Sequence, residues 1–546
     1  MTESRSLISL LTKWKSAVSG SKNLHPPVFD TNQDDIQVTN IVEHTGEVIE
    51  GSIFIARVRT GSDGHPHIKK AIASGAKVIF GEKSADELAN LNIEIPANVI
   101  YFQMTDSAEA TAWLAAAWYD FPGNHIHIIG ITGTNGKTTT SAILFGILRS
   151  AGLRCGLIST IRAVFGDKEE PTGLHVTTPA APQLQGYLRR MVDAGLTHCI
   201  IETTSHGLAQ HRVTAIPYEF GLLTNVTHEH IDYHGTFENY VSAKRRLFEL
   251  VALHLQGHAV LNSDDDLFAD YGSVPVPHQT TYGRFLLPDG QTPNVHASNV
   301  QFSASSTNFQ LHLNQENQPI TIETELLGHF NVENILCAAA TAEAVGVSGE
   351  TIASGVASVT AISGRMERID EGQSFLTIVD FAHTPDALEK AISSAKNMLD
   401  TQANPKGRII TVFGSAGKRD IEKRRLMAEV SAREADITVL TAEDPRTEPL
   451  EDILDMMAAG CRSQGGVEAS SFWRIPDRGQ AIYMALTLAQ PADIVLVCGK
   501  GHEQSMCFGT QEYPWDDRNA TRQALQAMLQ KKPMPPLGLP TETPSI

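Results

Sequence analysis

A glycine-rich segment from Gly130 to Thr140 has the residue types of a phosphate-binding loop. It reads GITGTNGKTTT, follows the apolar run HIHII, and precedes a stretch whose apolar residues recur at helical spacing. In that setting, backbone N–H groups and the start of a helix can wrap a phosphate, Lys137 can reach its outer oxygens, and the Thr138 hydroxyl can bind Mg²⁺. The common pattern has a glycine at 131, where this chain has Ile, so the loop is a variant with glycines at 130, 133 and 136.

This loop predicts a site for a nucleotide triphosphate. The residues expected to contact the nucleotide lie within it: Gly133, Thr134, Asn135, Gly136, Lys137, Thr138 and Thr139.

Carboxylates and histidines farther along the chain are candidates for the metal that a triphosphate requires. Glu202 ends the apolar run THCIIE, which places its carboxylate where an expected strand ends. Taken alone, such a Glu is more typical of a helix cap or a surface position. The next candidates are His228, His230, Asp232 and His234. Their spacing differs from the zinc-binding motif H-E-x-x-H, and no earlier Cys or His completes a set of zinc ligands. Each is therefore, by itself, more typical of an exposed residue or of one whose hydrogen bonds are made within the protein.

The composition indicates a folded, acidic chain. Its 546 residues suggest three or four domains at roughly 150 residues each. Lys and Arg number 43 against 62 Asp and Glu, a net charge of −19 that repels nucleic acid. The six cysteines include no C-x-x-C pair, and no apolar run is long enough to span a membrane. We therefore expect a cytoplasmic protein without membrane insertion.

Short apolar runs alternate with helical patterns and break into Gly, Ser or Thr, as in THCIIETTSHG, GRIITVFGSAG and DIVLVCGKGHE. This is typical of buried parallel strands in an α/β fold, whose ligands bind at the carboxyl ends of the strands. Breaks are expected at Phe121–Gly123 and at Ser363–Gly364. They divide the chain into residues 1–121, 122–362 and 363–532, and the proline-rich tail, 533–546, is expected to be disordered.

Several motifs together resemble the Mur ligase family, the ATP-dependent amide-forming enzymes of peptidoglycan precursor synthesis. They are GTNGKTT, HVTTP, ETTSHGLAQHRV, TNVTHEHIDYHGT, YVSAKRRLF, GHFNVENILCAA, GRMERI, DFAHTPDALE, FGSAGKRD, EDPRTE and GKGHE. The resemblance covers about residues 40 to 530. It implies an N-terminal uridine-nucleotide domain, a central P-loop ATPase and a C-terminal Rossmann-like domain.

The resemblance is strongest to the branch that adds the third residue of the peptide. It implies ligation of meso-diaminopimelate to UDP-N-acetylmuramoyl-L-alanyl-D-glutamate through an acyl phosphate, with ATP and Mg²⁺. Lys137, Glu202, His230 and Lys244 match the family's catalytic positions, and Thr138, Glu202, His230 and Lys244 match its metal site. Lys244 matches a lysine that the family carbamylates with CO₂, which would replace an ammonium that repels Mg²⁺ with an anion.

The resemblance also assigns binding residues. Asn334 and Asp380 match positions at the adenine and ribose, and Arg365 lies nearby on the ATP. Contacts to the muramoyl dipeptide are implied for Thr177, Thr178, Thr204, Gln210 and Arg212. Near the uridine the family's Asp-Ser-Arg is His44-Thr45-Gly46 here; Thr45 keeps the hydroxyl, but Gly46 has no charge.

Amino-acid selectivity is expected in the C-terminal domain. Members that add meso-diaminopimelate carry Asp-Asn-Pro-Arg, where this chain has Glu443, Asp444, Pro445 and Arg446. Arg446 can bind a distal carboxylate with two hydrogen bonds. The remaining diamino-acid contacts are implied for Arg419, Gly499 and Glu503. Asp444 adds negative charge beside the pocket, which favours a substrate with a further ammonium group. Lysine and ornithine therefore remain alternative substrates.

Two other interpretations remain. One is a family relative that extends another polyacid, such as a folylpolyglutamate synthetase or a cyanophycin-type ligase, although ETTSHGL and TNVTHEHIDYHGT favour the peptidoglycan branch. The other is a regulatory nucleotide-binding protein without catalysis, which the joint presence of Lys137, Glu202, His230 and Lys244 disfavours. The expected partners are small molecules, the expected state is a monomer, and Glu503 and His206 are candidates for the base that deprotonates the amine.

Overall fold

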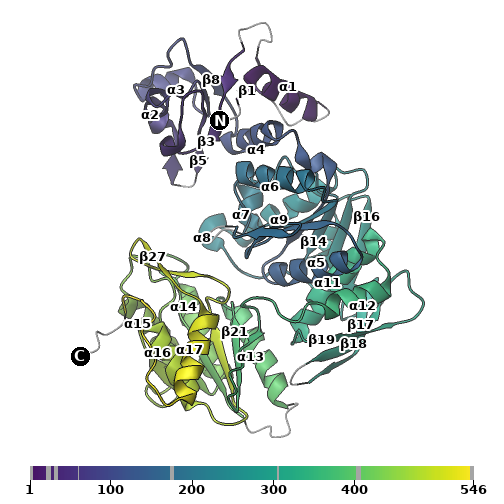
Figure 1. Cartoon of the computed structure of the whole chain (residues 1–546), viewed down its shortest axis with the longest axis vertical. Coiled ribbons are helices and arrows are strands. Elements are labelled where there is room, and N and C mark those ends of the chain that lie inside the picture. The colour runs from purple at the N-terminus through teal and green to yellow at the C-terminus, as the bar shows by residue number, and fades with distance from the viewer. Residues whose placement is uncertain are drawn as a thin grey trace.

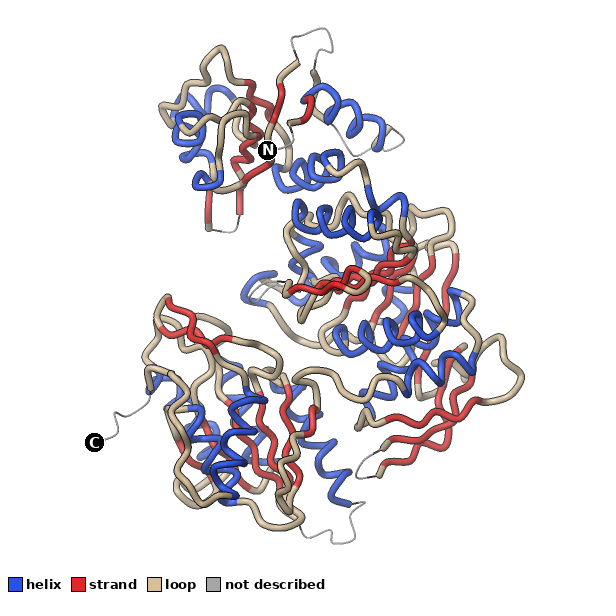
Figure 2. The backbone as a smooth tube through the Cα atoms, viewed as in Figure 1, coloured by secondary structure: helices blue, strands red, loops and turns tan. Residues whose placement is uncertain are grey.

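The computed structural model describes residues 4–19, 26–29, 35–59, 61–172, 177–303, 306–400 and 407–541. Three units follow one another along these residues, each built on its own β-sheet (Figure 1). The N-terminal and C-terminal units lie on the same side of the central unit (Figure 1). The tube view shows helices against all three sheets, so the expected α/β class is confirmed (Figure 2).

The N-terminal unit contains a parallel sheet in the order β3-β4-β7-β8. These strands are Ile41–Val42, Ile53–Ala56, Val78–Gly81 and Ile100–Gln103. The short strands outside it are β1 (Arg5–Ser6), β2 (Gln37–Val38), β5 (Val58–Arg59) and β6 (Ser62–Asp63). Its helices are α1 (Leu7–Ala17), α2 (Ile68–Ala73), α3 (Ala85–Asn90) and α4 (Ser107–Trp118). Ser84 and Glu87 form a reciprocal capping box that fixes the start of α3.

The central unit contains a long mixed sheet in the order β12-β11-β10-β13-β9-β14-β15-β16-β17-β18-β19. The strands from β10 to β17 in this order run parallel: β10 (Cys155–Ile158), β13 (His198–Glu202), β9 (His127–Thr132), β14 (Phe220–Leu223), β15 (His258–Asn262), β16 (His278–Gly283) and β17 (Val295–Phe302). Antiparallel strands extend both edges: β11 (Ala163–Phe165), β12 (Lys168–Glu170), β18 (Thr307–His312) and β19 (Ile320–Thr324).

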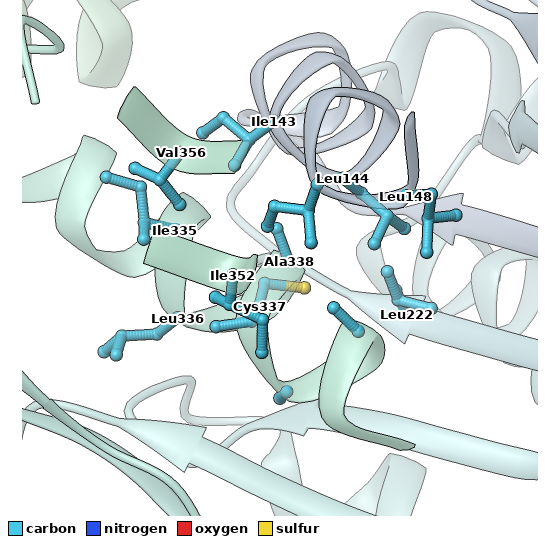
Figure 3. Packing of buried hydrophobic residues seen from close by; sticks show 14 of the residues in the cluster. Ile143, Leu144, Leu148, Leu222, Ile335, Leu336, Cys337, Ala338, Ile352 and Val356 are labelled. Carbon is cyan, nitrogen blue, oxygen red and sulfur yellow. The ribbon is translucent and has the colours of Figure 1, made fainter. Parts of the chain in front are cut away.

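Helices cover the central sheet: α5 (Lys137–Ser150), α6 (Ala181–Asp193), α7 (Ser205–Ala209), α8 (Ile231–His234), α9 (Phe237–Val251), α10 (Phe268–Gly272), α11 (His329–Val345) and α12 (Gly349–Ala357). Figure 3 shows where α5, α11 and α12 meet: Leu144, Ala338 and Val356 lie together and are buried. Burying such side chains stabilises the unit by roughly 1.5–3 kcal/mol for each large aliphatic group. This core fixes α5, and therefore the glycine loop at its start.

The C-terminal unit contains a sheet in the order β20-β21-β25-β22-β23-β24. Its strands are Glu367–Arg368, Leu376–Asp380, Ile494–Cys498, Ile409–Phe413, Ile437–Leu440 and Phe472–Arg474. A hairpin, β26 (Ser505–Phe508) and β27 (Gln511–Pro514), follows β25. The helices are α13 (Pro385–Asp400), α14 (Glu422–Glu434), α15 (Leu450–Ser463), α16 (Arg478–Leu488) and α17 (Asp517–Leu529).

The proline-rich tail differs from the expectation of disorder. Met534 and Leu539 are 5% and 4% exposed and pack into the core of the C-terminal unit. The Thr541 hydroxyl also donates to Asp477 at 2.9 Å. The expectation was therefore wrong for residues 533–541, because two well-placed apolar side chains anchor a segment that is otherwise rich in proline. Residues 542–546 lie outside the described residues.

Among the described residues, no helix combines the length and apolar character needed to cross a bilayer.

Candidate active site

Three neighbouring parallel strands end at the same edge of the central sheet. β9 lies between β13 and β14, with Glu202 paired to Ile131 and Leu223 paired to Thr132. The residues that follow these strand ends therefore meet in space, although they are far apart in sequence. The glycine loop follows β9, Glu202 ends β13, and Thr224 follows β14.

Two glycines of the loop are required by geometry. Gly133 and Gly136 have φ angles of +149° and +86°, which favour glycine. A Cβ on Gly133 would collide with the Thr224 hydroxyl, and one on Gly136 would collide with the Asn334 side chain. The loop thus closes tightly over β14 and α11, with Lys137 as the first residue of α5.

Lys137 lies over the loop that it follows. Its Nζ donates to the carbonyl oxygens of Gly133 at 2.8 Å and Thr134 at 2.9 Å. Burial lowers the pKa of Lys137, and Glu229 and Glu202 partly oppose that effect. The ammonium is therefore held at the place where a phosphate bound by the loop needs a counter-charge.

Glu202 is fully buried and is surrounded by hydroxyl groups. Thr138 and Thr160 donate to its Oε2 at 3.0 and 2.8 Å, and Ser141 donates to its Oε1 at 3.1 Å. The family resemblance assigns Thr138 and Glu202 to one metal site, whereas no motif in the sequence marks Ser141 or Thr160. Hydroxyl and carboxylate oxygens are the ligands that Mg²⁺ prefers, so this donor set fits that metal.

Lys244 projects from α9 into the same place. It is 2% exposed, and its Nζ donates to the carbonyl oxygen of Gly133 at 2.7 Å. The Nζ also lies 4.5 Å from the centre of the Tyr240 ring, whose hydroxyl is 2.8 Å from that of Thr134. Burial and then the charge of Lys137 lower the pKa of Lys244 well below its ordinary value.

His230 and His234 both lie beside the His206 ring, but their polar contacts differ. His230 has a left-handed backbone (φ 58°), and its ring lies 4.7 Å from that of His206. Burial lowers the pKa of His230 to about 4 and that of His206 to about 3. His234 instead has its Nε2 3.1 Å from the Ser205 hydroxyl. Among the described residues, no three His, Cys, Asp or Glu side chains converge as a metal cluster.

Glu229 was missed by the sequence analysis. Its carboxylate lies 3.7 Å from His230 Nε2 and 3.6 Å from His383 Nε2. Burial raises the pKa of Glu229, but His230, His383 and Lys137 outweigh burial and hold that pKa below its usual range. Because His383 belongs to the C-terminal unit, Glu229 links that unit to His230 of the central unit.

A cavity lies between the central and C-terminal units. The loop contributes Asn135, Gly136 and Thr139, and Asn334, Arg365 and Asp380 line the same space. Asn135 donates to Asp386 at 3.0 Å across this junction. The structure therefore brings the predicted nucleotide residues together, and the cavity is continuous with the loop that is suited to phosphate.

Arg365 and Asp380 are fixed by neighbours within the C-terminal unit. Both Asp380 carboxylate oxygens accept backbone N–H groups, from Met366 at 2.7 Å and Ala382 at 2.8 Å. The Arg365 guanidinium lies 4.4 Å from the centre of the Phe381 ring, and burial lowers its pKa. Its buried Nε has no hydrogen-bond partner among the described residues, which leaves a donor for a ligand.

The predicted dipeptide residues form one polar group beside Glu202. Thr178 donates to the backbone oxygen of Glu202 and lies 2.9 Å from the Thr204 hydroxyl. Arg212 donates to the Gln210 side chain and to the Thr178 carbonyl oxygen, the latter at 2.6 Å. Thr177 joins this group because its hydroxyl lies 3.0 Å from the Thr160 hydroxyl, which can accept its proton.

Thr45 is not part of this group. It starts a 3₁₀ helix, Thr45–Glu47, in the N-terminal unit. Arg57, which no sequence motif marked, connects the N-terminal unit to the central unit. Its guanidinium donates to Glu43 of the N-terminal unit at 2.7 Å and to the Gln210 carbonyl oxygen of the central unit at 2.9 Å.

The predicted diamino-acid residues follow strand ends of the C-terminal sheet. Glu443 and Gly499 lie close enough that a Cβ on Gly499 would touch the Glu443 carboxylate. Pro445 precedes Arg446 in the same loop, and Glu503 Oε2 lies 2.5 Å from Lys500 Nζ. Arg419 is exposed, and its charge contributes to the lowered pKa of His206 in the central unit.

Comparison with known proteins gives consistent matches. Residues 131–342 match the Mur ligase middle domain, and residues 364–501 match the Mur ligase glutamate ligase domain. A UDP-N-acetylmuramoyl-L-alanyl-D-glutamate–2,6-diaminopimelate ligase of Geobacillus kaustophilus is 38% identical over 88% of this chain and 93% of its own length.

Solved structures agree with these matches. A structure of a ligase of the same name has a TM-score of 0.62 at 27% identity, and the match covers 97% of this chain and all of that chain. A MurF ligase from Thermotoga maritima, in complex with ADP, shares the fold with a TM-score of 0.56 at 18% identity, over 90% of this chain and 97% of that chain.

Proposed function

The chain belongs to the Mur ligase family, and from this premise we propose that it joins meso-diaminopimelate to UDP-N-acetylmuramoyl-L-alanyl-D-glutamate at the expense of ATP. The observation that carries this proposal is the convergence of Lys137, Glu202 and Lys244 on the glycine loop. Lys137 and Lys244 both donate to the carbonyl oxygen of Gly133, and Glu202 accepts from Thr138 in the first turn of α5.

The reaction needs such a site because a carboxylate is a poor electrophile. The D-glutamyl carboxylate attacks the γ-phosphorus of ATP, ADP leaves, and an acyl phosphate forms. The amine then attacks the acyl carbon, phosphate leaves, and an amide remains after the amine loses its proton. The glycine loop orients the triphosphate, and Lys137 offsets the charge that grows on the transferred phosphoryl group.

Thr138, Glu202 and His230 would hold Mg²⁺, which would neutralise phosphate charge. Thr160 and Ser141 fix the orientation of the Glu202 carboxylate, because both of its oxygens accept hydroxyl hydrogen bonds. Lys244 would be carbamylated: its ammonium loses a proton, the free amine adds to CO₂ and releases a second proton, and a cation that opposes Lys137 becomes an anion. The burial of Lys244 beside a second ammonium supports this modification.

The polar group of Thr177, Thr178, Thr204, Gln210 and Arg212 would bind the muramoyl dipeptide. The cavity lined by Asn334, Arg365 and Asp380 would bind the adenosine of ATP. The loop Glu443–Arg446, with Arg419, Gly499 and Glu503, would bind the diamino acid. The free thiols in the described residues fit a reducing, cytoplasmic location.

Phosphate release tests this function directly. The protein is supplied with ATP, Mg²⁺ and the UDP-muramoyl dipeptide, and the amino acid is varied among meso-diaminopimelate, lysine and ornithine. We expect the highest kcat/KM with meso-diaminopimelate, and Arg446→Ala should lower it at least about tenfold, which corresponds to roughly 1.4 kcal/mol of lost recognition. Equal rates with lysine would remove the role of Arg446. Turnover with folate or with an aspartate polymer instead would favour the other family branches.

A further inference from the structure

The loop that follows β23 has an unusual backbone. Asp444 and Arg446, neither of them glycine, have φ angles of 38° and 55°. A side-chain-bearing residue in the left-handed region is disfavoured by about 1–3 kcal/mol and persists only where its surroundings hold it. The contacts that hold this loop therefore decide where the Arg446 guanidinium lies.

The Asp444 side chain makes the hydrogen bonds that fix the backbone of this loop. Its Oδ1 accepts from Lys500 Nζ at 2.9 Å and from the backbone N–H of Cys507 at 2.9 Å. Arg446 in turn donates its N–H to the Cys507 carbonyl oxygen at 3.0 Å and accepts from the Gly509 N–H at 2.7 Å. Asp444 thus fixes the backbone of β26, against which Arg446 is paired.

The charge of Asp444 is also satisfied within the protein. Asp444 is 5% exposed, and Lys500, which is fully buried, lies between Asp444 and Glu503. Burial lowers the pKa of Lys500, but Glu503 and Asp444 outweigh burial and raise that pKa above its ordinary value. The Asp444 carboxylate therefore does not offer a free charge to a substrate ammonium.

Two atoms of the same loop remain available for a ligand. Glu443 Oε2 and Arg446 Nε are buried, and neither has a hydrogen-bond partner among the described residues. Buried polar atoms are normally paired, so an unpaired carboxylate oxygen and an unpaired guanidinium N–H in one loop suit a zwitterion with an ammonium and a carboxylate.

We propose that Asp444 is a positioning residue for amino-acid selectivity, which acts on the diamino acid through the backbone of Cys507 and the place of Arg446. This inference rests on the proposed function. It differs from the expectation that Asp444 attracts an additional substrate ammonium, which would favour lysine or ornithine.

Two substitutions at Asp444 separate these roles. Asp444→Ala removes both contacts, whereas Asp444→Asn keeps an oxygen that can accept from Cys507 N–H. We expect Asp444→Ala to raise the KM for meso-diaminopimelate about tenfold, to reduce the preference over lysine by a similar factor, and to leave the KM for ATP within about twofold. Asp444→Asn should restore most of the preference. Asp436→Ala is a matched control, because Asp436 also accepts a backbone N–H, from Ile409 at 2.8 Å, at the opposite end of β23.

Hydrogen exchange provides a second measurement that needs no turnover. Peptides that span residues 505–509 should exchange faster in Asp444→Ala than in wild type, and Asp444→Asn should stay close to wild type. If Asp444→Asn lost the preference as fully as Asp444→Ala, direct contact with the substrate would replace the positioning role. An unchanged preference in Asp444→Ala would also overturn the inference. A wild-type protein that ligates no diamino acid would instead refute the proposed function.

Discussion

Lys137 and Lys244 donate to the same backbone oxygen, that of Gly133, at 2.8 and 2.7 Å. Two ammonium groups on one acceptor repel each other, and the charge of Lys137 adds to burial in lowering the pKa of Lys244. An anion between them would relieve this repulsion. The arrangement explains why a phosphate, or a carbamate on one of the amines, suits this place.

Removal of the Lys137 amine should abolish most of the activity. Lys137→Ala is expected to lower kcat by about 10³, or roughly 4 kcal/mol of transition-state stabilisation, because the phosphoryl group then lacks a preorganised cation. The measurement is ADP release at saturating substrates. Lys168→Ala is the control, since Lys168 lies on the exposed strand β12. A Lys137→Ala enzyme with full coupling rate would contradict the proposed mechanism.

Carbamylation of Lys244 can be observed directly. Protein equilibrated with ¹³C-labelled bicarbonate should show a carbamate carbon resonance that Lys244→Gln lacks and that Lys396→Gln retains, because Lys396 is half-exposed and paired with Glu434. Activity should fall when CO₂ is removed and recover when bicarbonate returns. A spectrum with no carbamate signal in wild type, together with activity independent of CO₂, would rule out the modification.

The ordered tail should contribute to stability. Met534→Ala and Leu539→Ala should each lower the free energy of unfolding by about 2–4 kcal/mol, because both side chains are buried in the C-terminal core. Denaturant unfolding measures this change. Leu529→Ala is the control, since Leu529 is 46% exposed and should matter little. Unchanged stability in both tail variants would mean that the tail does not pack in solution.

Acid should destabilise the central unit through His258. Burial and then the nearby His278 lower the pKa of His258 to about 4 in the folded protein, while Glu219 opposes this shift. Above the unfolded value of 6.5 neither state is protonated. As the pH falls from 6.5 towards 4, His258 binds a proton in the unfolded chain but stays neutral in the folded protein. The free energy of unfolding therefore decreases over this range and levels off below it.

His258→Gln tests this pH dependence, because glutamine can still bond to Thr280, which His258 Nε2 approaches to 2.8 Å. Between about pH 7 and pH 5, the melting temperature should fall less for the variant than for wild type. Parallel curves for the two proteins would show that His258 does not titrate as expected.

Much of the site followed from local sequence. The α/β class, the glycine loop and the strand-end position of Glu202 depend on patterns within a few residues, and the structure contains all three. Ser141, Thr160 and Glu229 could not be assigned in this way. Their side chains are ordinary polar residues, and only the packing of neighbouring elements brings them to Glu202, His230 and His383.

The tail and Asp444 show the same limit. Composition indicated disorder at residues 533–541, and charge alone suggested that Asp444 would attract an ammonium. Both expectations depended on residue type alone, whereas the outcome depends on which residues lie next to these in the folded protein. The tail meets an apolar core, and Asp444 meets Lys500.

The sequence by itself determined the alternation of strands and helices, the phosphate-binding loop and the family of the chain, because each depends on residues that are close together along the backbone. The tertiary structure decided which distant side chains share one carbonyl oxygen, one carboxylate or one buried lysine. Those pairings depend on the order of strands in the sheets and on the contact between units. The spacing of residues within a short motif determines neither of these.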